Sequence, residues 1–373
     1  MTTPAAEPGS AEPTSAPTSR RLSIRGRNAL IASGAAVALA VIAAVLPVPF
    51  LIVSPGPTFN TIGEVNDVPL VQITETQTYP TDGHLDMTTV REAGEPRSRI
   101  TVFQALAAWA STSRAVLPRE LLYPDDITGE EVTQRNAALF STSQSYAIAA
   151  AMGVLDRPVI ATPVITAVVA GSPAEGKLSP GEQITAINGQ SVTEPSEVSE
   201  LVRAQPIGAT LAFAVVREGE PLTVDVVSVA SPDDAQQPYV GIGVGLLYSA
   251  EFPIEFTLQD VGGPSAGLMF TLAIVDILTP ESLTGGDFVA GTGTIDPAGQ
   301  VGPIGGIRQK LAGARDAGAE LFLMPIQHCE ESAGAVPDGL TVVPVESVDD
   351  ALVALEAWQA GTPTVSCPAT ELS

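Results

Sequence analysis

Two stretches carry the most specific information in this sequence, namely Gly262-Gly-Pro-Ser-Ala-Gly267 and Pro303-Ile-Gly-Gly-Ile-Arg-Gln-Lys310. The first stretch precedes the apolar run 268–278, which predicts a buried helix that begins just after Ser265. Backbone N–H groups and the helix dipole at a helix start can stabilise an oxyanion, so a serine in this place could act as a nucleophile. Serine and proline are also common in helix caps, so the stretch alone equally fits a purely structural cap.

Lysine is the rare basic residue of this chain. Of 17 basic residues, only Lys177 and Lys310 are lysines. A lysine can lose its proton at a pH where arginine cannot, so it can serve as a base. Partial burial against Ile307 and Leu311 would lower the pKa of Lys310. The neutral amine could then accept the proton of Ser265, although spacing alone favours an exposed helix lysine. Lys177 is expected to be a solvated turn residue.

The two histidines offer little support for a Ser-His-Asp enzyme. His84 lies in a segment expected to form a β-hairpin from strands at residues 70–76 and 85–90, and His328 follows no H-E-x-x-H pattern. Both are expected to be surface histidines. No dinucleotide fingerprint or metal-ligand cluster is evident either, so we expect neither a cofactor nor a metal.

The chain has two cysteines, Cys329 and Cys367. We expect a disulfide between them, because both follow an apparent membrane span and a disulfide persists outside the cytoplasm. Two free thiols are the alternative. A zinc site would lack ligands, since only His328 lies beside Cys329.

An apolar segment near the N-terminus predicts one transmembrane helix over residues 28–53, where no charged residue occurs. About 20 apolar residues suffice to cross the hydrocarbon core. A cleaved signal peptide, the alternative, would have a shorter apolar run and a clear small-residue cleavage site. Four arginines precede the segment, so the N-terminus is expected in the cytoplasm and the later domains outside the cell membrane. Residues 1–27 have the composition of a disordered tail.

The formal net charge is −25, from 42 acidic and 17 basic residues. Such a charge excludes a large phosphate-binding surface over most of the molecule, so nucleic acid is not an expected partner. The charge by itself identifies no substrate.

Residues 156–231 alternate short β-rich runs with turns. Within them, the turn Gly171-Ser-Pro-Ala174, the run Leu178-Ser-Pro-Gly-Glu-Gln-Ile-Thr-Ala-Ile-Asn-Gly-Gln-Ser-Val192 and a helix-like segment after it resemble a PDZ domain. PDZ domains bind an extended peptide as an added strand, often with its carboxylate on backbone N–H groups. The resemblance implies recruitment of peptides or unfolded proteins; a purely structural β domain is the alternative. The usual Gly-hydrophobic-Gly-hydrophobic loop is not evident before Val164.

Residues 237–355 resemble the proteolytic domain of Lon, a Ser-Lys peptidase. The resemblance rests on the two opening stretches, on Gly291-Thr-Gly293 and on Leu321-Phe-Leu-Met-Pro325. It implies that Ser265 is the nucleophile, that Lys310 is its general base and that Thr292 orients the lysine. It is also compatible with a ring-shaped homo-oligomer.

Residues 66–155 resemble the early part of the same proteolytic domain. We therefore expect an α+β fold in which the PDZ domain is inserted into one Lon-type domain, followed by a tail over residues 356–373. The combination with a transmembrane helix is similar to the YlbL group of bacterial membrane-anchored Lon-like proteases. This resemblance implies a serine endopeptidase that acts through an acyl-enzyme; a catalytically silent PDZ scaffold is the alternative.

Two features differ from ATP-dependent Lon. Gly262 stands where those proteins typically have an aspartate, three residues before the nucleophile, and no G-x-x-x-x-G-K-[ST] loop occurs. We therefore expect no ATP-driven unfolding by this chain.

Overall fold

The computed structural model describes residues 23–94, 99–121, 123, 128–217, 219–258 and 261–367. Residues 1–22 of the expected N-terminal tail lie outside this part of the chain, as do residues 368–373 of the expected C-terminal tail.

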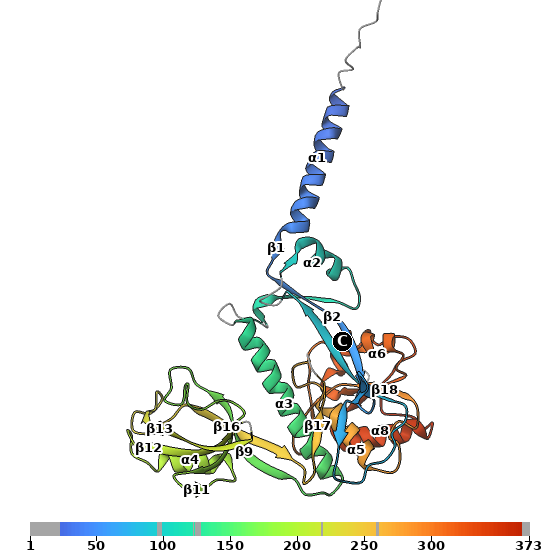
Figure 1. Cartoon of the computed structure of the whole chain (residues 1–373). Helices are drawn as coiled ribbons and strands as arrows, with labels where there is room; N and C mark the ends of the chain where they lie inside the picture. Colours follow the sequence, from blue (N-terminus) through green and yellow to red (C-terminus); the bar gives the residue numbers. More distant parts are fainter. Residues whose placement is uncertain are drawn as a thin grey trace, which may run out of the picture.

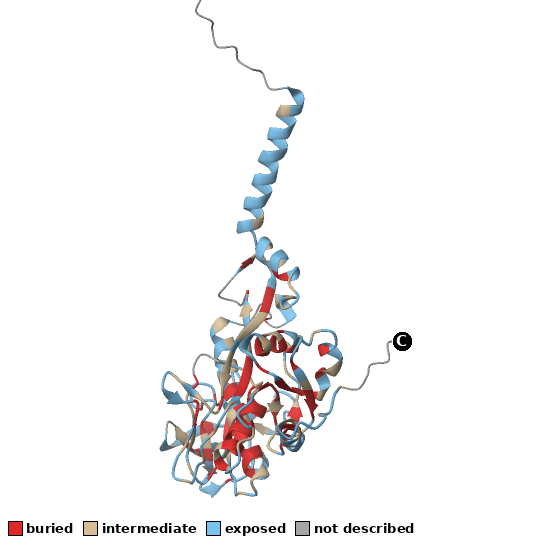
Figure 2. Cartoon of the chain, turned by 90° about the vertical axis from the view of Figure 1, so that its right-hand side faces the viewer, coloured by how far each residue is buried: buried red, intermediate tan, exposed pale blue. Residues whose placement is uncertain are grey.

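Helix α1 (Ile24–Val45) stands away from the body and is exposed along its length (Figures 1 and 2). It is the one helix in the described residues that is long and apolar enough, by length and composition, to cross a membrane. The predicted end at residue 53 was wrong. Strands β1 (Pro47–Val48) and β2 (Phe50–Asn60) follow directly after the helix. The prediction extended too far because the apolar residues of a buried strand resemble those of a membrane span.

The body is built on a six-stranded mixed sheet in the order β22-β21-β18-β6-β2-β8. Strands β6, β18, β21 and β22 run parallel, whereas β2 is antiparallel to β6 and to β8. The bounds not yet given are β6 (His84–Ala93), β8 (Ala115–Pro118), β18 (Phe288–Gly291), β21 (Leu321–Pro325) and β22 (Thr341–Val345).

Helices cover both faces of this sheet. On one face, α3 (Gly129–Val154), α5 (Gly267–Leu278) and α8 (Val348–Gln359) form the main core. On the other face, α6 (Ile307–Ala317) packs against β2 and β6. Strand β21 contributes to both sides, because alternate side chains point in opposite directions. Leu321 and Leu323 belong to the main core, whereas Phe322 and Met324 contact the core beneath α6.

The expected hairpin between residues 70–76 and 85–90 was wrong. Strand β5 (Val71–Ile73) pairs with β17 (Ile254–Phe256), and β6 pairs with β2 and β18. Both segments are strands as predicted, but Tyr79 instead binds the carbonyl of Ile277 through its backbone N–H (2.9 Å), so the connection leaves the sheet rather than turning back.

The PDZ-like module has its own sheet and core. Its strand order is β13-β12-β10-β9-β16, and β11 (Gln190–Ser191) pairs with β10. The elements are β9 (Ile160–Val168), β10 (Gln183–Ile187), α4 (Pro195–Arg203), β12 (Thr210–Arg217), β13 (Glu220–Val227) and β16 (Ile242–Ser249). A separate apolar cluster around Phe213 fills it.

The insertion of the PDZ module is confirmed. Strands β2 and β6 precede the module in the chain and share one sheet with β18, β21 and β22, which follow it. Helix α3, before the module, packs against α5, after it. The remaining elements are β3 (Glu64–Val65), β4 (Val68–Pro69), β7 (Ile100–Thr101), α2 (Val102–Trp109), η1 (Arg119–Leu121), β14 (Val229–Ala230), β15 (Pro238–Tyr239), β19 (Thr294–Ile295), β20 (Val301–Gly302), η2 (Ile326–His328) and α7 (Cys329–Ser332).

Candidate active site

Ser265 lies two residues before α5, the most deeply buried helix of the body. The first residue of this helix must be small, because a Cβ on Gly267 would lie 2.6 Å from the Ile295 side chain. Backbone hydrogen bonds fasten the segment to the loop after β18, since Gly293 donates to the Ser265 carbonyl at 3.0 Å. The Ser265 side chain itself is only half-buried. The fold thus holds a partly accessible hydroxyl on a rigid support.

Lys310 reaches this hydroxyl from the opposite side of the sheet. It lies on α6, which begins after Gly306 in a left-handed conformation (φ 72°) that glycine adopts without strain. Its Nζ lies 2.7 Å from the Ser265 Oγ and 2.8 Å from the Thr292 Oγ1, and only 1% of the residue is exposed. The structure therefore brings all three predicted residues together.

Burial lowers the pKa of Lys310 from 10.5 to about 7. The cause is the loss of water around the ammonium, which disfavours its charged form. Within the described residues no carboxylate forms a salt bridge with Lys310 that would oppose this shift. A large fraction of neutral amine is therefore present at neutral pH.

Thr292 is fully buried and joins the other two residues. Its hydroxyl donates to the Ser265 carbonyl at 3.0 Å, so the proton of that hydroxyl points away from the lysine. The oxygen then accepts a hydrogen bond from the Lys310 Nζ. This arrangement fixes the position of the amine relative to the serine.

Two residues of α3 that sequence reasoning missed hold the peptide units before the serine. The Ser143 hydroxyl donates to the Pro264 carbonyl at 3.0 Å, and the Gly263 N–H donates to the Asn136 carbonyl at 3.0 Å. In a trans peptide the C=O and N–H point in opposite directions, so the Ser265 N–H points away from Ser143. No acceptor within the described residues takes the N–H of Ser265 or Ala266. These two groups are candidate oxyanion donors.

Helix α3 also explains why position 262 is a glycine. A Cβ at this position would lie 2.8 Å from the Asn136 Cβ, so an aspartate does not fit without a shift of α3. The departure from ATP-dependent Lon thus has a steric reason in this fold.

The histidines have structural contacts. His84 stacks on Phe288 with 4.3 Å between ring centroids and lies 3.3 Å from Asp86. The expectation of a surface position was wrong for His328, which is 7% exposed. Its Nε2 accepts the Ile304 N–H at 2.8 Å, so it anchors the segment that leads into α6.

Cys329 and Cys367 form a disulfide that joins α7 to the segment after α8. The two sulfurs are thus bonded to each other, and neither cysteine is a free thiol. No group of three or more potential metal ligands occurs in the described part of the chain.

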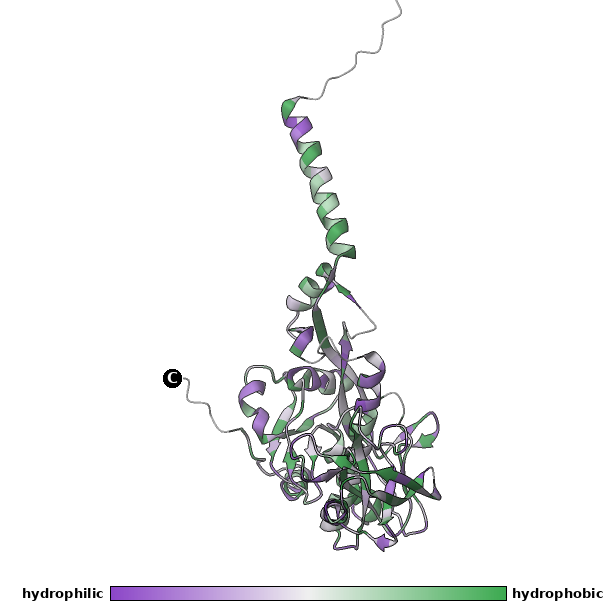
Figure 3. Cartoon of the chain, turned by 90° about the vertical axis from the view of Figure 1, so that its left-hand side faces the viewer, coloured by the Kyte–Doolittle hydropathy of each residue, from purple (hydrophilic) through white to green (hydrophobic). Residues whose placement is uncertain are grey.

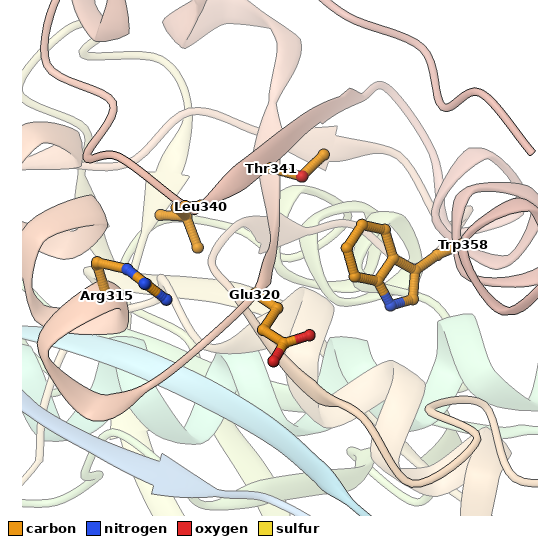
Figure 4. A pocket seen from close by; sticks show the side chains of 6 residues that line it. Arg315, Glu320, Leu340, Thr341 and Trp358 are labelled. Atoms are coloured by element: carbon orange, nitrogen blue, oxygen red, sulfur yellow. The ribbon is translucent and has the colours of Figure 1, made fainter. Parts of the chain in front are cut away.

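A hollow of about 400 Å³ lies away from this site, between α6, β22 and α8 (Figure 4). Arg315, Glu320, Leu340, Thr341 and Trp358 line it together with Gly339. Its lining includes none of Ser265, Thr292 and Lys310, so the candidate site is defined by the geometry around Ser265 rather than by this hollow.

The PDZ module carries a second candidate site at β16, the edge strand of its sheet, beside α4. The loop that leads into β16 reads Val240-Gly-Ile-Gly-Val244, the hydrophobic-Gly pattern that we did not find before Val164. It follows the rest of the module in the chain, so a search after residue 231 would have found it.

The carbonyls of Val240 and Gly241 face the module, where they accept from the N–H groups of Ala174 (3.0 Å) and Val169 (2.9 Å). The N–H groups of Gly241 and Ile242 therefore point the other way, toward the free edge. Gly241 has φ 82°, and a Cβ there would lie 2.1 Å from the Ser172 Cβ. The loop can present backbone donors to a carboxylate.

Family models match two segments of the chain. The Lon protease (S16) C-terminal proteolytic domain matches residues 259–357, and the PDZ domain matches residues 164–217. The chain thus contains one region similar to the Lon proteolytic domain and another similar to a PDZ domain. The first match includes Ser265 and Lys310, and the second covers the PDZ module from β9 to β12. The α+β fold with an inserted PDZ domain is the expected one.

Among curated proteins similar to this chain, the mitochondrial Lon protease homolog of Debaryomyces hansenii is 41% identical over 87 residues, which are 22% of this chain and 8% of the relative. The Lon protease of Campylobacter concisus is 29% identical over 151 residues, 39% of this chain and 18% of the relative. The chain thus spans less than one fifth of their length. A solved PDZ domain of the SdrC-like protein from Listeria monocytogenes covers 22% of this chain and 86% of its own, with 19% identity and a TM-score of 0.21.

Proposed function

We propose that this Lon-like chain is a membrane-anchored, ATP-independent serine endopeptidase with a Ser265–Lys310 dyad. The observation that carries the proposal is the 2.7 Å contact between the serine hydroxyl and a buried lysine amine that has no carboxylate partner among the described residues. A desolvated, neutral lysine next to a serine is the arrangement that general-base activation requires.

Acylation begins when the neutral Lys310 Nζ takes the proton of the Ser265 Oγ as this oxygen attacks the scissile carbonyl carbon. The N–H groups of Ser265 and Ala266 stabilise the oxyanion of the tetrahedral intermediate. The C–N bond then breaks, and the Lys310 ammonium gives its proton to the leaving amine. An ester between Ser265 and the acyl half of the substrate remains.

Deacylation repeats the same steps with water. Lys310, neutral again, takes a proton from water as the water oxygen attacks the ester carbon. The ester bond breaks, the proton returns to the Ser265 oxygen, and the carboxylic acid leaves. Thr292 acts as a positioning residue in both halves, since it contacts the amine and the serine carbonyl.

We further propose that the PDZ module recruits peptides or unfolded proteins through β16. An extended segment can add to this free edge, with a terminal carboxylate near the N–H groups of Gly241 and Ile242. ATP independence is inferred from the lack of a Walker A loop in the sequence.

Helix α1 is proposed to anchor the chain in the cell membrane with its N-terminus in the cytoplasm. The arginines that precede the apolar segment favour this orientation. The disulfide between Cys329 and Cys367 also favours a position of the body outside the cytoplasm.

The experiment is digestion of an unfolded protein such as casein by the full chain in detergent, with and without ATP. We expect cleavage that ATP does not change and that both Ser265→Ala and Lys310→Ala abolish. An intact casein with the wild-type chain, together with binding of C-terminal peptides, would instead support a silent PDZ scaffold.

A further inference from the structure

We propose that α2 is an interfacial helix that lies in the headgroup region of the membrane leaflet from which α1 emerges. The inference rests on the proposed membrane anchoring by α1 and extends it to a second element. It identifies a lipid surface as the partner of an apolar face that the fold leaves uncovered.

Helix α2 has one buried and one exposed apolar face. Ala105 and Ala108 pack toward the cluster of Ile52 and Ile100. Phe103, Leu106 and Trp109 follow at helical spacing on the other side of the helix and are 66%, 58% and 79% exposed. Three large side chains on one exposed face of a helix are typical of a surface that contacts another apolar phase.

The position of α2 relative to α1 is fixed by backbone contacts. The N–H of Val102 donates to the carbonyl of Leu46 at 3.3 Å, and β1 pairs with β7 immediately before α2. Helix α2 also contacts α1 itself. The apolar α1 thus ends directly at the part of the body that carries α2 (Figures 1 and 3).

The length of α1 places the membrane boundary at this level. Its uncharged part runs from Asn28 to Val45. About 18 residues rise about 27 Å at 1.5 Å per residue, which is less than the hydrocarbon thickness of about 30 Å. The edge of the hydrocarbon layer therefore extends past Val45 to Leu46, whose carbonyl accepts the hydrogen bond from Val102 of α2.

Charge also fits an anionic lipid surface. Residues 99–121 contain three arginines and one glutamate, whereas the whole chain carries −25. Arg99 and Arg114, on either side of α2, are exposed. Helix α2 itself has no charged residue, and tryptophan is enriched at membrane interfaces.

The two tryptophans allow a matched test in the full chain. Trp358→Phe leaves Trp109 as the only tryptophan, and Trp109→Phe leaves Trp358 on α8, which lies away from α1 (Figure 1). Each variant is reconstituted into vesicles of phosphatidylcholine and phosphatidylglycerol with bromine either near the headgroup or near the chain ends. Circular dichroism and flotation check folding and insertion.

We expect Trp109 to lose most of its emission to the shallow bromines and less to the deep ones, while Trp358 keeps its emission with both. Phe103→Ser with Leu106→Ser in the Trp358→Phe background should shift the Trp109 emission to the red and weaken its quenching. Unquenched Trp109 in chains that float with the vesicles would overturn the proposal. So would a Trp109 emission shielded from bromine by a second copy of the chain.

Failure of anchoring gives a different result. If the chain does not float with the vesicles, both the anchoring by α1 and the lipid contact of α2 are wrong, whereas cleavage of casein is unaffected.

Discussion

The Lon-type domain and the PDZ module differ in how far other elements cover their sheets. In the Lon-type domain, helices cover both faces, and a lysine that is 1% exposed lies beside the serine. In the PDZ module, β16 has a partner strand on only one side within the described residues, and it lies next to α4. Burial lowers the pKa of the proposed base in the first region, and incomplete strand pairing leaves the proposed binding edge in the second. One region is therefore suited to chemistry and the other to recognition.

Helix α3 contacts both regions. Its Ser143 holds the Pro264 carbonyl next to the nucleophile, and two residues later its Ser145 accepts the Tyr248 N–H of β16 at 2.6 Å. Substitutions in the two regions should therefore separate chemistry from recognition, and α3 offers variants on each side.

The largest effect is expected when the dyad is broken. Ser265→Ala removes the nucleophile, and Lys310→Met removes the base while it keeps an apolar side chain of similar length. Each should reduce kcat/KM for a short peptide by about 10³-fold or more. Binding of a C-terminal peptide to the PDZ module, measured by fluorescence polarisation, should stay unchanged. Residual cleavage near the wild-type rate in Lys310→Met would assign the base to another group.

The next effect is the pH dependence of cleavage. Because the pKa of Lys310 is about 7, the fraction of neutral amine increases as pH increases through this value. Activity should therefore rise from pH 5 and level off above pH 8, by about 10²-fold in all. A rate profile of kcat/KM measures it. A midpoint near the ordinary lysine pKa would contradict a desolvated base.

The pH dependence of the free energy of unfolding should also reflect the titration of Lys310. The pKa of Lys310 is lower in the folded state than its ordinary 10.5, so the unfolded chain binds more protons between pH 7 and 10.5. The free energy of unfolding should rise with pH across this window, and Lys310→Met should flatten the rise. Urea denaturation at several pH values tests this, with Ser265→Ala as the control that keeps the lysine.

A smaller effect is expected at Ser143. Ser143→Ala frees the peptide unit that precedes Ser265, so the oxyanion donor is less well oriented. We expect kcat to fall by about 10-fold with little change in KM, less than the loss of a direct oxyanion donor. Ser145→Ala, two residues further on the same helix, is the control and should leave short-peptide cleavage near wild type. Equal losses in both variants would indicate a general effect on α3.

The smallest effect on chemistry is expected at Gly241. Gly241→Ala combines a left-handed φ with a clash against Ser172, a strain of about 1–3 kcal/mol in the loop before β16. Peptide binding should weaken by about 10-fold or more, while cleavage of short peptides continues. Gly171→Ala is a matched control, since it also has positive φ but no atom within 4 Å of its Cβ. Equal loss of binding in the control would remove the loop from the binding site.

The sequence predicted the parts of the fold that depend on local patterns. The apolar run after Gly267 and the segment around Lys310 are helices near the expected bounds, and the inserted PDZ module is confirmed. The failures involve partners distant in the chain. Apolar residues 50–53 fit a span as well as a buried strand, and no local pattern showed that β5 pairs with β17.

The residues of the candidate site also fall into those that the sequence could predict and those that it could not. Ser265 and Lys310 could be named because serine at a helix start and a rare lysine are visible in the sequence. Their 2.7 Å contact required the fold. Ser143 could not be named, because it lies 121 residues before the carbonyl it binds. The loop at Gly241 was visible as a motif but lies after the rest of the module in the chain.

The most direct test of the dyad is acylation of Ser265 itself. The full chain in detergent is incubated at pH 8 with an activated peptide ester, quenched in acid, digested and analysed by mass spectrometry, beside Lys310→Met. We predict an acyl group on the peptide that contains Ser265 in the wild-type chain and none in Lys310→Met. An unmodified Ser265 in the wild type, or equal acylation in both chains, would contradict a serine activated by this lysine.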